Sequence, residues 1–387
     1  MIWAKRWTSR ACISSRARPA ALQLVLAVFC LAAAAPLGAA EARVEMLGRM
    51  SFPDQAAGTE AKPLVITGLS GVAWLGDTAW AAAMDNSDRL VTFTLELSAK
   101  GAPTAVTDVQ TVRLEARHDY EDLAVCPPEL ARRITRRFTT KGRPDPGPCL
   151  LLCEEDTPAI RGAALADGRL VGLMPIPDVL KSRRPNRGLE ALTVEPDGSC
   201  IWTANEEALT LDGPAPSTTT GTVVRLVAIP IPTAAGTAAT GTAAGAVADN
   251  NSRQVAYPVD PPHEFVEFLK GEAFSGVVAL VALGNGRLLV LERSAARGLP
   301  PLENRIYYVD TVGAPDATGV ERDLAARPEL FVKKQLLWKD ALGCNLEGLA
   351  LGPALPGGAR SLVAIADNGG IGTPTQLVTF RLTGAGL

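Results

Sequence analysis

The sequence contains very little of what zinc sites and nucleophilic active sites need. Of its 387 residues only 2 are histidine, His118 and His263, and only 5% are aromatic. No Cys/His cluster has the spacing of zinc ligands, which argues against a zinc site. A Gly-x-Ser-x-Gly elbow, a Ser-x-x-Lys pair and a Gly-rich phosphate loop are also missing. The usual serine-hydrolase and nucleotide-binding classes therefore have no sequence support.

Long apolar runs are absent beyond the N-terminal segment, so we expect no membrane span in the mature chain. The first residues read as a secretory signal, because five cations precede an apolar run over 20–35 and a small-x-small site follows at 40–42. Bulky Phe29 before Cys30 argues against a lipid anchor. We expect a signal peptide over residues 1–42 and a periplasmic or secreted domain over 43–387.

Acidic residues outnumber basic ones more clearly once that segment is removed. Its five cations take the formal charge from −3 to −8 for a chain that begins at Glu41. An acidic surface argues against nucleic-acid partners and suits a cation. Five cysteines remain, an odd number, so at least one thiol stays unpaired. The predicted disulfide joins Cys126 to Cys149 across a basic, Pro-rich insertion, and Cys126 to Cys153 is the competing pairing.

The chain repeats itself. A small or acidic residue before an apolar strand recurs at Ser70, Glu121, Glu190, Ser275 and Glu347, and a second apolar strand ends in an acid each time, at Asp85, Glu154, Glu206, Glu292 and Asp367. The first set is spaced by 51, 69, 85 and 72 residues, the length of a four-stranded blade plus loops. This indicates an all-β propeller of about five four-stranded blades, with six as the alternative.

The last repeat is too short for a whole blade. The segment from Arg43 to Phe52 supplies the missing strand, which predicts a ring closed by the N-terminal strand. The Ala/Gly/Thr-rich stretch at 233–250 is expected to be a flexible loop. Helix signals are few, and the best lie at 178–182 and 322–331.

The geometry of a blade brings the start of its first strand next to the end of its second. The repeated acids should therefore crowd one mouth of the channel, and like charges so close need a cation or strong donors. Calcium takes six to eight oxygen ligands in irregular geometry and is the cofactor we expect. The competing interpretation is structural, with the acids bonded to backbone N–H groups or paired with Arg187 and Arg293. His118 is a further candidate near the mouth, although such a histidine is more often a surface residue.

Distinctive segments lie at 186–192 with 205–209, at 289–294 (Leu-Val-Leu-Glu-Arg-Ser), at 345–350 and at 366–368. In the same order, they resemble the phytase-like family that is described as having esterase-like activity of phytase. The resemblance implies a secreted propeller with phosphoester or ester hydrolysis, and it points to Glu190, Glu206, Glu292, Arg293, Glu347, Asp367 and Asn368. Asp122 and Ala191 depart from the glycine that the repeat usually has at that position.

Two hypotheses of different classes follow. The first is a calcium-assisted hydrolase of a small phosphate ester at the acidic mouth, with Glu190, Glu347 or His118 as catalytic candidates and Arg187 and Arg293 neutralising phosphate. Its metal ligands would be Asp85, Glu121, Glu154, Glu190, Glu206, Glu292, Glu347, Asp367 and Asn368. The second is a non-catalytic propeller that binds a ligand or protein on the same face.

Overall fold

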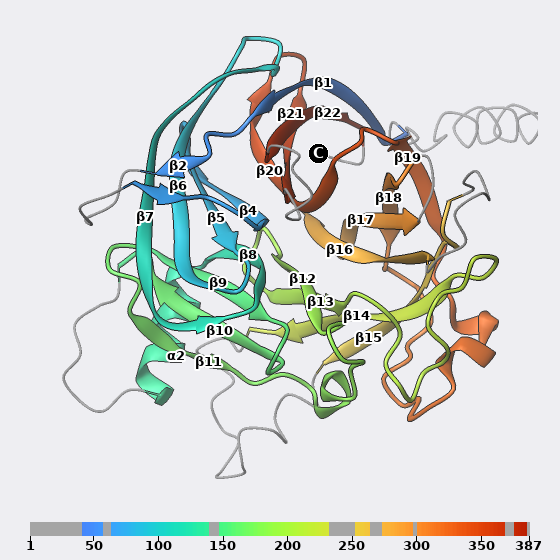
Figure 1. Cartoon of the computed structure of the whole chain (residues 1–387). Coiled ribbons are helices and arrows are strands. Elements are labelled where there is room, and N and C mark those ends of the chain that lie inside the picture. The colour runs from blue at the N-terminus through green and yellow to red at the C-terminus, as the bar shows by residue number, and fades with distance from the viewer. Residues whose placement is uncertain are drawn as a thin grey trace, which may run out of the picture. The chain divides into compact units, whose positions relative to one another are not determined.

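The computed structural model describes residues 41–56, 63–138, 147–231, 252–263, 273–296, 300–367 and 375–384. They form five four-stranded antiparallel sheets arranged as a β-propeller (Figure 1). The predicted architecture is confirmed, and five blades is the correct number. The 20-residue gap at 232–251 separates β14 from β15, which pair directly with each other, so the Ala/Gly/Thr-rich stretch is a connection within blade 3. The predicted flexibility of 233–250 itself falls outside the described residues.

Each blade runs outward from an inner strand. Blade 1 contains β4 (Leu69–Gly76), β5 (Ala79–Met84), β6 (Ser87–Leu97) and β7 (Pro103–His118). Blade 2 contains β8 (Tyr120–Cys126), β9 (Cys149–Glu154), β10 (Ala159–Ala164) and β11 (Leu170–Met174). Blade 3 contains β12 (Leu189–Val194), β13 (Cys200–Asn205), β14 (Thr222–Pro230) and β15 (Arg253–Val259). Blade 4 contains β16 (Ala273–Gly284), β17 (Arg287–Ala296), β18 (Leu302–Asp310) and β19 (Lys334–Asp340).

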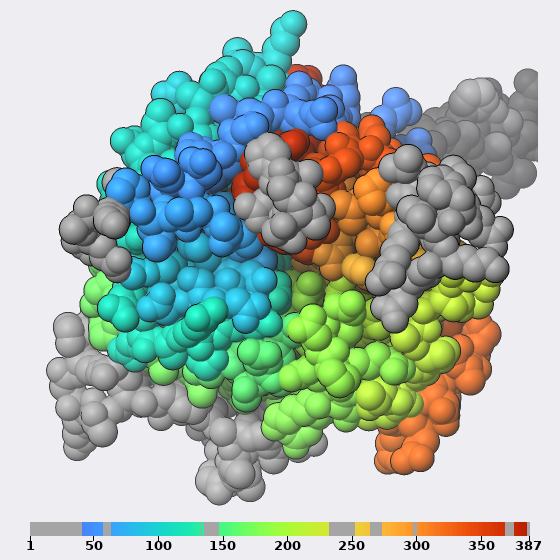
Figure 2. Space-filling view, in the orientation of Figure 1, coloured from blue at the N-terminus to red at the C-terminus, as the bar shows by residue number. Residues whose placement is uncertain are grey.

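Blade 5 joins the two ends of the domain. It contains β20 (Asn345–Leu355), β21 (Ala359–Asp367), β22 (Gln376–Thr383) and, as its outer strand, β1 (Arg43–Ser51). β1 pairs with β22 from Arg43 opposite Thr383 to Ser51 opposite Gln376, which confirms the predicted closure. In the space-filling view the colours follow one another around the ring (Figure 2). No sheet edge is left open between the first and last blades.

Few elements lie outside the blades. β2 (Gln55–Ala56) and β3 (Leu64–Val65) form a small pair. The 3-10 turns η1 (Asp178–Lys181), η3 (Leu324–Ala326) and η4 (Pro328–Leu330) fall where helix signals were found. The helix α2 (Pro128–Phe138) was not predicted. None of the helices in the described part of the chain is long and apolar enough to cross a membrane.

The inner strands pack against each other around the channel because the repeat places small residues at their points of contact. A Cβ on Gly71 would lie 2.5 Å from Asp122 Cα, and one on Gly348 would lie 2.5 Å from the Ser70 carbonyl oxygen. Blade 2 has Asp122 at this position, and its buried carboxylate accepts N–H bonds of 2.8 Å from Leu123 and from Leu192 of blade 3. Close packing therefore fixes the ends of β4, β8, β12, β16 and β20 around one axis.

Candidate functional site

Three glutamates open the inner strands at one end of the channel. Glu121, Glu190 and Glu347 stand near the starts of β8, β12 and β20, and they interact electrostatically with one another. Burial raises the pKa of all three carboxyls, that of Glu347 to about 7, and the neighbouring carboxylates raise those of Glu121 and Glu190 further. The predicted convergence of these first-strand acids is confirmed.

Four more acids stand at or directly after the ends of the second strands, and each lies near the next blade. Asp85 is close to Asp119 and Glu121, and the Glu155 carboxylate accepts a 2.8 Å bond from Gly188 N–H. Glu206 bonds to Arg293 of blade 4 at 2.6 Å. Asp367 interacts with Asp85 of blade 1 and with Glu347. The junctions between blades therefore carry the second half of the acidic cluster.

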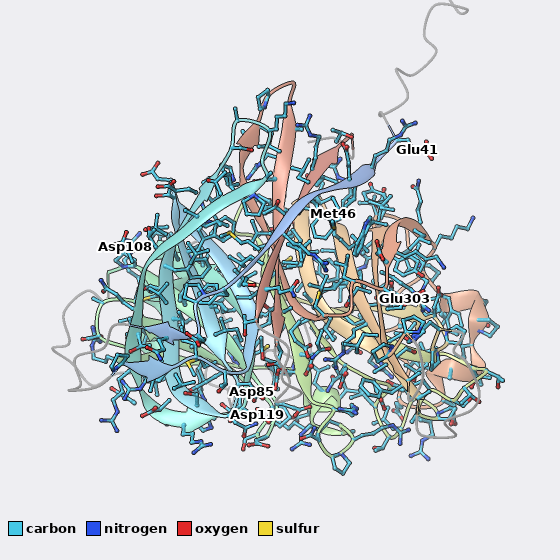
Figure 3. All side chains as sticks on the ribbon, turned by 45° about the horizontal axis from the view of Figure 1, so that its top comes forward. Glu41, Met46, Asp85, Asp108, Asp119 and Glu303 are labelled. Carbon is cyan, nitrogen blue, oxygen red and sulfur yellow. The ribbon has the colours of Figure 1, made fainter. Side chains whose placement is uncertain are left out.

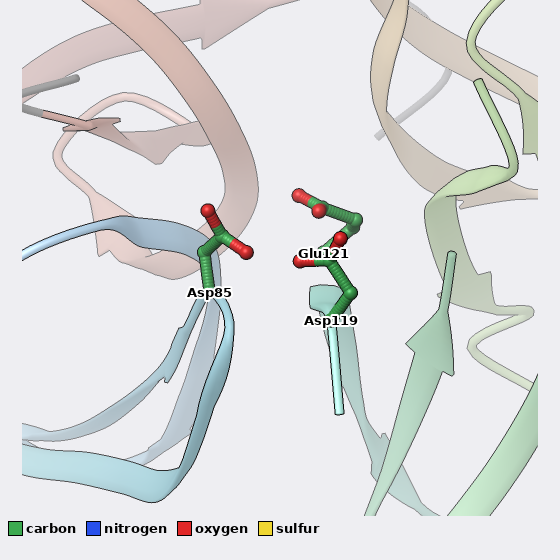
Figure 4. Close-up of side chains that lie close together, drawn as sticks. All are labelled: Asp85, Asp119 and Glu121. Atoms are coloured by element: carbon green, nitrogen blue, oxygen red, sulfur yellow. The ribbon is translucent and has the colours of Figure 1, made fainter. Parts of the chain in front are cut away.

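Two carboxylate trios are the tightest parts of this cluster. One oxygen from each of Asp85, Asp119 and Glu121 lies within 4.8 Å of the other two, and the same holds for Glu155, Glu190 and Glu206. Figure 4 shows the first trio, with its carboxylates pointing toward one another from two blades, and Asp85 and Asp119 lie side by side in Figure 3. We call the whole set the acidic mouth; it comprises Asp85, Asp119, Glu121, Glu155, Glu190, Glu206, Glu207, Glu347 and Asp367.

Two acids of the predicted metal set lie elsewhere, so their assignment to the mouth is wrong. Glu154 is paired with Tyr120 in the β8–β9 register; its buried carboxylate bonds to Arg161 and lies 3.2 Å from His118 Nδ1. Its neighbour Glu155 faces the mouth instead, since successive strand residues point to opposite faces. Glu292 bonds to Lys334 Nζ at 2.6 Å and to the Tyr257 hydroxyl at 2.7 Å. Adjacent Arg293 is the residue that reaches the mouth.

Three acids of the mouth were not predicted from the sequence, namely Asp119, Glu155 and Glu207. Each is next to, or two residues from, an acid that the repeat did identify, as in Glu154-Glu155 and Glu206-Glu207. Such doublets were the available signal, but the repeat alone does not say which member of a doublet faces inward.

The two predicted substrate-binding arginines are at the mouth but are neutralised there. Arg187 lies 3.0 Å from a Glu206 oxygen and 3.1 Å from a Glu207 oxygen. Buried Arg293 bonds to Glu206 at 2.6 Å, to Glu347, and to Asn345 at 3.0 Å. Both guanidinium groups rest on the Phe274 ring, at 4.9 and 5.4 Å from its centroid. These contacts make the arginines clamps for Glu206 and Glu347.

Three amide side chains stand beside the acids of the mouth. Asn86 donates to Asp85 at 2.8 Å and Asn345 donates to Glu347 at 2.5 Å. Buried Asn205, directly before Glu206, has no hydrogen-bond partner among the described residues for either its oxygen or its nitrogen. Asn368 lies outside the described residues.

Neither histidine contributes to the acidic mouth. His118 is paired with Glu154 and stacks edge-on with Tyr120. His263 is buried; its Nδ1 lies 2.6 Å from Ser294 Oγ and its Nε2 lies 2.7 Å from the Pro300 carbonyl. Both residues are buried and both imidazole nitrogens have partners, so we interpret the Ser294–His263 pair as structural.

The two cysteines of the predicted disulfide stand directly opposite each other on β8 and β9, but the structure carries them as thiols. Both are buried, and burial together with the neighbouring Cys149 raises the pKa of the Cys126 thiol to about 12. The bridge is therefore not formed here. The register still suits it, because opposed Cα atoms of an antiparallel pair lie within disulfide range.

Further along, the channel becomes apolar. A cavity of about 180 Å³ is lined by residues of all five inner strands, among them Trp74, Leu123, Leu192, Leu280 and Leu349. The channel therefore has one acidic end and one apolar end.

The fold and this end of the channel define a five-bladed propeller with a carboxylate-rich mouth. The family model described as "Esterase-like activity of phytase" matches residues 65–370, and the chain belongs to this phytase-like family. No curated protein matches.

Solved structures resemble the chain only distantly. Periplasmic gluconolactonase PpgL of Pseudomonas aeruginosa has 11% identity and a TM-score of 0.33, over 81% of this chain and 85% of that one. The α-L-arabinanase of Cellvibrio cellulosa has 11% identity and a TM-score of 0.36, over 81% and 91%. Kluyveromyces lactis Hsv2 has 11% identity and a TM-score of 0.26; the match covers 72% of this chain and 63%, less than two thirds, of that one.

Proposed function

We propose that the chain is an exported hydrolase that cleaves a small phosphate ester at the acidic mouth with the help of a divalent cation, best fitted by calcium. The observation that carries this proposal concerns Glu121 and Glu190. Among the described residues, neither carboxylate receives a hydrogen bond or an ion pair from a donor, although Glu190 is buried. Buried carboxylates without donors require protons or a cation.

The residues present fit calcium. Carboxylates and the unpartnered amide oxygen of Asn205 are hard oxygen ligands, and two trios offer oxygens close enough to share one ion. Arg187 and Arg293 hold Glu206 and Glu347 in fixed positions facing the channel. When bound, the cation supplies Lewis-acid activation of water and of a phosphoryl oxygen. Ser294 is buried beside His263, away from the acidic mouth, so we do not assign it as the nucleophile. The nucleophile we assign is water.

A second function, a non-catalytic propeller that binds a ligand on this face, is favoured by the neutralised arginines. Because Arg187 and Arg293 are paired with carboxylates, their positive charges are offset and would attract a phosphate only weakly. A cationic ligand would suit such a mouth without any chemistry.

Metal analysis and hydrolysis assays on the purified mature protein separate the two functions. We expect bound calcium, and release of p-nitrophenol from p-nitrophenyl phosphate that stops with a chelator and returns with added calcium. Calcium binding with no hydrolysis of phosphate or acetate esters supports the binding module. A protein that neither binds divalent cations nor hydrolyses these esters contradicts the proposal.

A further inference from the structure

The segment 183–187 forms a fixed lip beside the acidic mouth. Arg184 Nε donates to the Ala208 carbonyl at 3.1 Å and its Nη2 donates to the Gly213 carbonyl at 2.5 Å. The backbone bridges between Arg184 and Arg187, and Asn186 takes a left-handed φ of 54°. Arg187 in turn bonds to Glu206 and Glu207 of the mouth. The lip is thus tied to the end of blade 3 by several independent contacts.

Arg183 differs from the other arginines of the mouth in its partners. Its Nη1 donates to the Arg184 carbonyl at 3.0 Å and its Nη2 donates to the Asp156 carbonyl. Within the described part of the chain, no carboxylate lies within 4.0 Å of its guanidinium nitrogens, whereas Arg187 and Arg293 each contact two carboxylates. The positive charge of Arg183 is therefore not offset by a nearby carboxylate. Its guanidinium also has further N–H donors beyond the two that bond to these carbonyls.

The stem of Arg183 lies directly beside one carboxylate trio. A Cβ on Gly188 would lie 3.0 Å from Arg183 Cδ and 2.7 Å from Glu155 Cγ, so the two side chains flank the same glycine. Glu155 belongs to the trio with Glu190 and Glu206. Arg183 is half-buried, which leaves it reachable from solvent while its carbonyl partners limit its movement.

We propose that Arg183 forms an anion subsite that binds the phosphoryl group of the substrate next to the Glu155, Glu190 and Glu206 trio. Guanidinium groups bind phosphate oxygens through parallel N–H donors, and a charge that no carboxylate offsets binds them more strongly than one that is already paired. The inference rests on the proposed function and assigns its phosphate-binding role to Arg183 instead of Arg187 and Arg293.

The subsite also explains how an acidic mouth could accept a phosphate. Nine carboxylates would repel a dianion unless a cation and an unpaired guanidinium stood together at its edge. A neutral carboxylic ester has no such requirement. Arg183 should therefore govern the choice between charged and neutral substrates, and it should have little effect on cation binding.

The test compares Arg183→Met and Arg183→Lys with the parent. Arg253→Met is the matched control, because Arg253 also donates to carbonyls, those of Thr311 and Ala314, but on the outer strand β15. Calorimetry measures binding of inorganic phosphate in the presence of calcium, and KM is measured for p-nitrophenyl phosphate and p-nitrophenyl acetate. Calcium binding and the melting temperature are recorded for every variant.

For Arg183→Met we expect the Kd for phosphate and the KM for the phosphate ester to rise roughly ten- to hundredfold. The KM for the acetate ester and calcium binding should not change, and Arg183→Lys should recover part of the loss. Unchanged phosphate binding, or equal losses with both esters, overturns the subsite. If the parent hydrolyses neither ester, the proposed function fails, while the phosphate titrations still decide the subsite.

Discussion

Asp119 offers the sharpest test of whether the acidic mouth binds a cation. One oxygen of its carboxyl group lies within 4.8 Å of one from Asp85, and two carboxyls so close retain a proton when no cation stands between them. Burial, followed by hydrogen bonding and charge repulsion from Asp119, raises the pKa of Asp85 to about 8. At neutral pH without metal, the pair therefore keeps a proton that the unfolded chain has lost.

This proton makes stability of the metal-free protein depend on pH. The Asp85 pKa is about 8 in the folded chain against an ordinary pKa of 3.8, so the folded state binds more protons between these values. Its stabilising contribution is complete below about pH 4 and is lost as the pH rises through about 8. The slope is about −1.4 kcal/mol per pH unit for each proton retained.

Asp119→Asn removes one negative charge and places an amide donor beside Asp85. Because Asp85 is partly exposed, we discount the full shift to about 2 kcal/mol of relief at pH 8. Without calcium, the variant should melt about 3 °C higher than the parent at pH 8 and at the same temperature at pH 4. With calcium the order should reverse at pH 8, because the variant lacks a ligand and gains less from the ion.

Differential scanning calorimetry at pH 4, 6 and 8, with chelator and with calcium, measures all of these values. Thr107→Ala on the exposed strand β7 is a suitable surface control. An Asp119→Asn variant that is less stable than the parent in chelator at pH 8 would refute the shared proton. An equal calcium-induced rise in melting temperature in parent and variant would show that Asp119 is not a ligand of the cation.

Three further predictions address the mouth, the closure and the cysteines. Glu347→Gln keeps an acceptor for Arg293 but loses the charge, so it should cost about 1–3 kcal/mol and remove most of the calcium-induced rise in melting temperature; a parent with no such rise would make this acid architectural. Deletion of residues 43–52 removes β1 and buried Phe52, and should cost about 5 kcal/mol or more in urea titrations; a truncated chain as stable as the parent contradicts the closure. Oxidised, exported protein should contain a Cys126–Cys149 bridge worth ~3 kcal/mol, seen by peptide mapping without reduction; two alkylatable thiols in that material would exclude it.

The repeat carried the fold prediction because its signals are local. Alternating apolar strands with a small or acidic residue at the start of each inner strand recur in every blade, and the four spacings, together with the segment 43–52, add up to a closed ring. Helix α2 was missed because the four arginines in its sequence obscure a short apolar stripe. Leu130, Ala131 and Ile134 are buried against blade 2, and Pro128 with Glu129 begins the helix in the usual way.

The site was harder to predict because one residue of register decides which way a side chain points. Glu154 and Glu155 are equivalent in the sequence, and only the pairing of Tyr120 with Glu154 turns Glu155 toward the mouth. In blade 4 the offset between β16 and β17 places Arg293, not Glu292, at the mouth. The ion-pair partners were harder still to predict, because they come from distant parts of the sequence. Glu206 pairs with Arg187 of the lip and with Arg293 of blade 4.

Blade 2 carries an acid with backbone donors and an acid without them side by side in one strand. Asp122 is buried and accepts two backbone N–H bonds, one of them from blade 3, so joining the blades explains it fully. Glu121, the residue before it, faces the mouth, where burial and neighbouring carboxylates raise its pKa. A purely structural role predicts a donor for each repeated acid, as for Asp122. Glu121 and Glu190 lack one among the described residues, so hydrogen bonding within the ring does not account for them, whereas the proposed cation would.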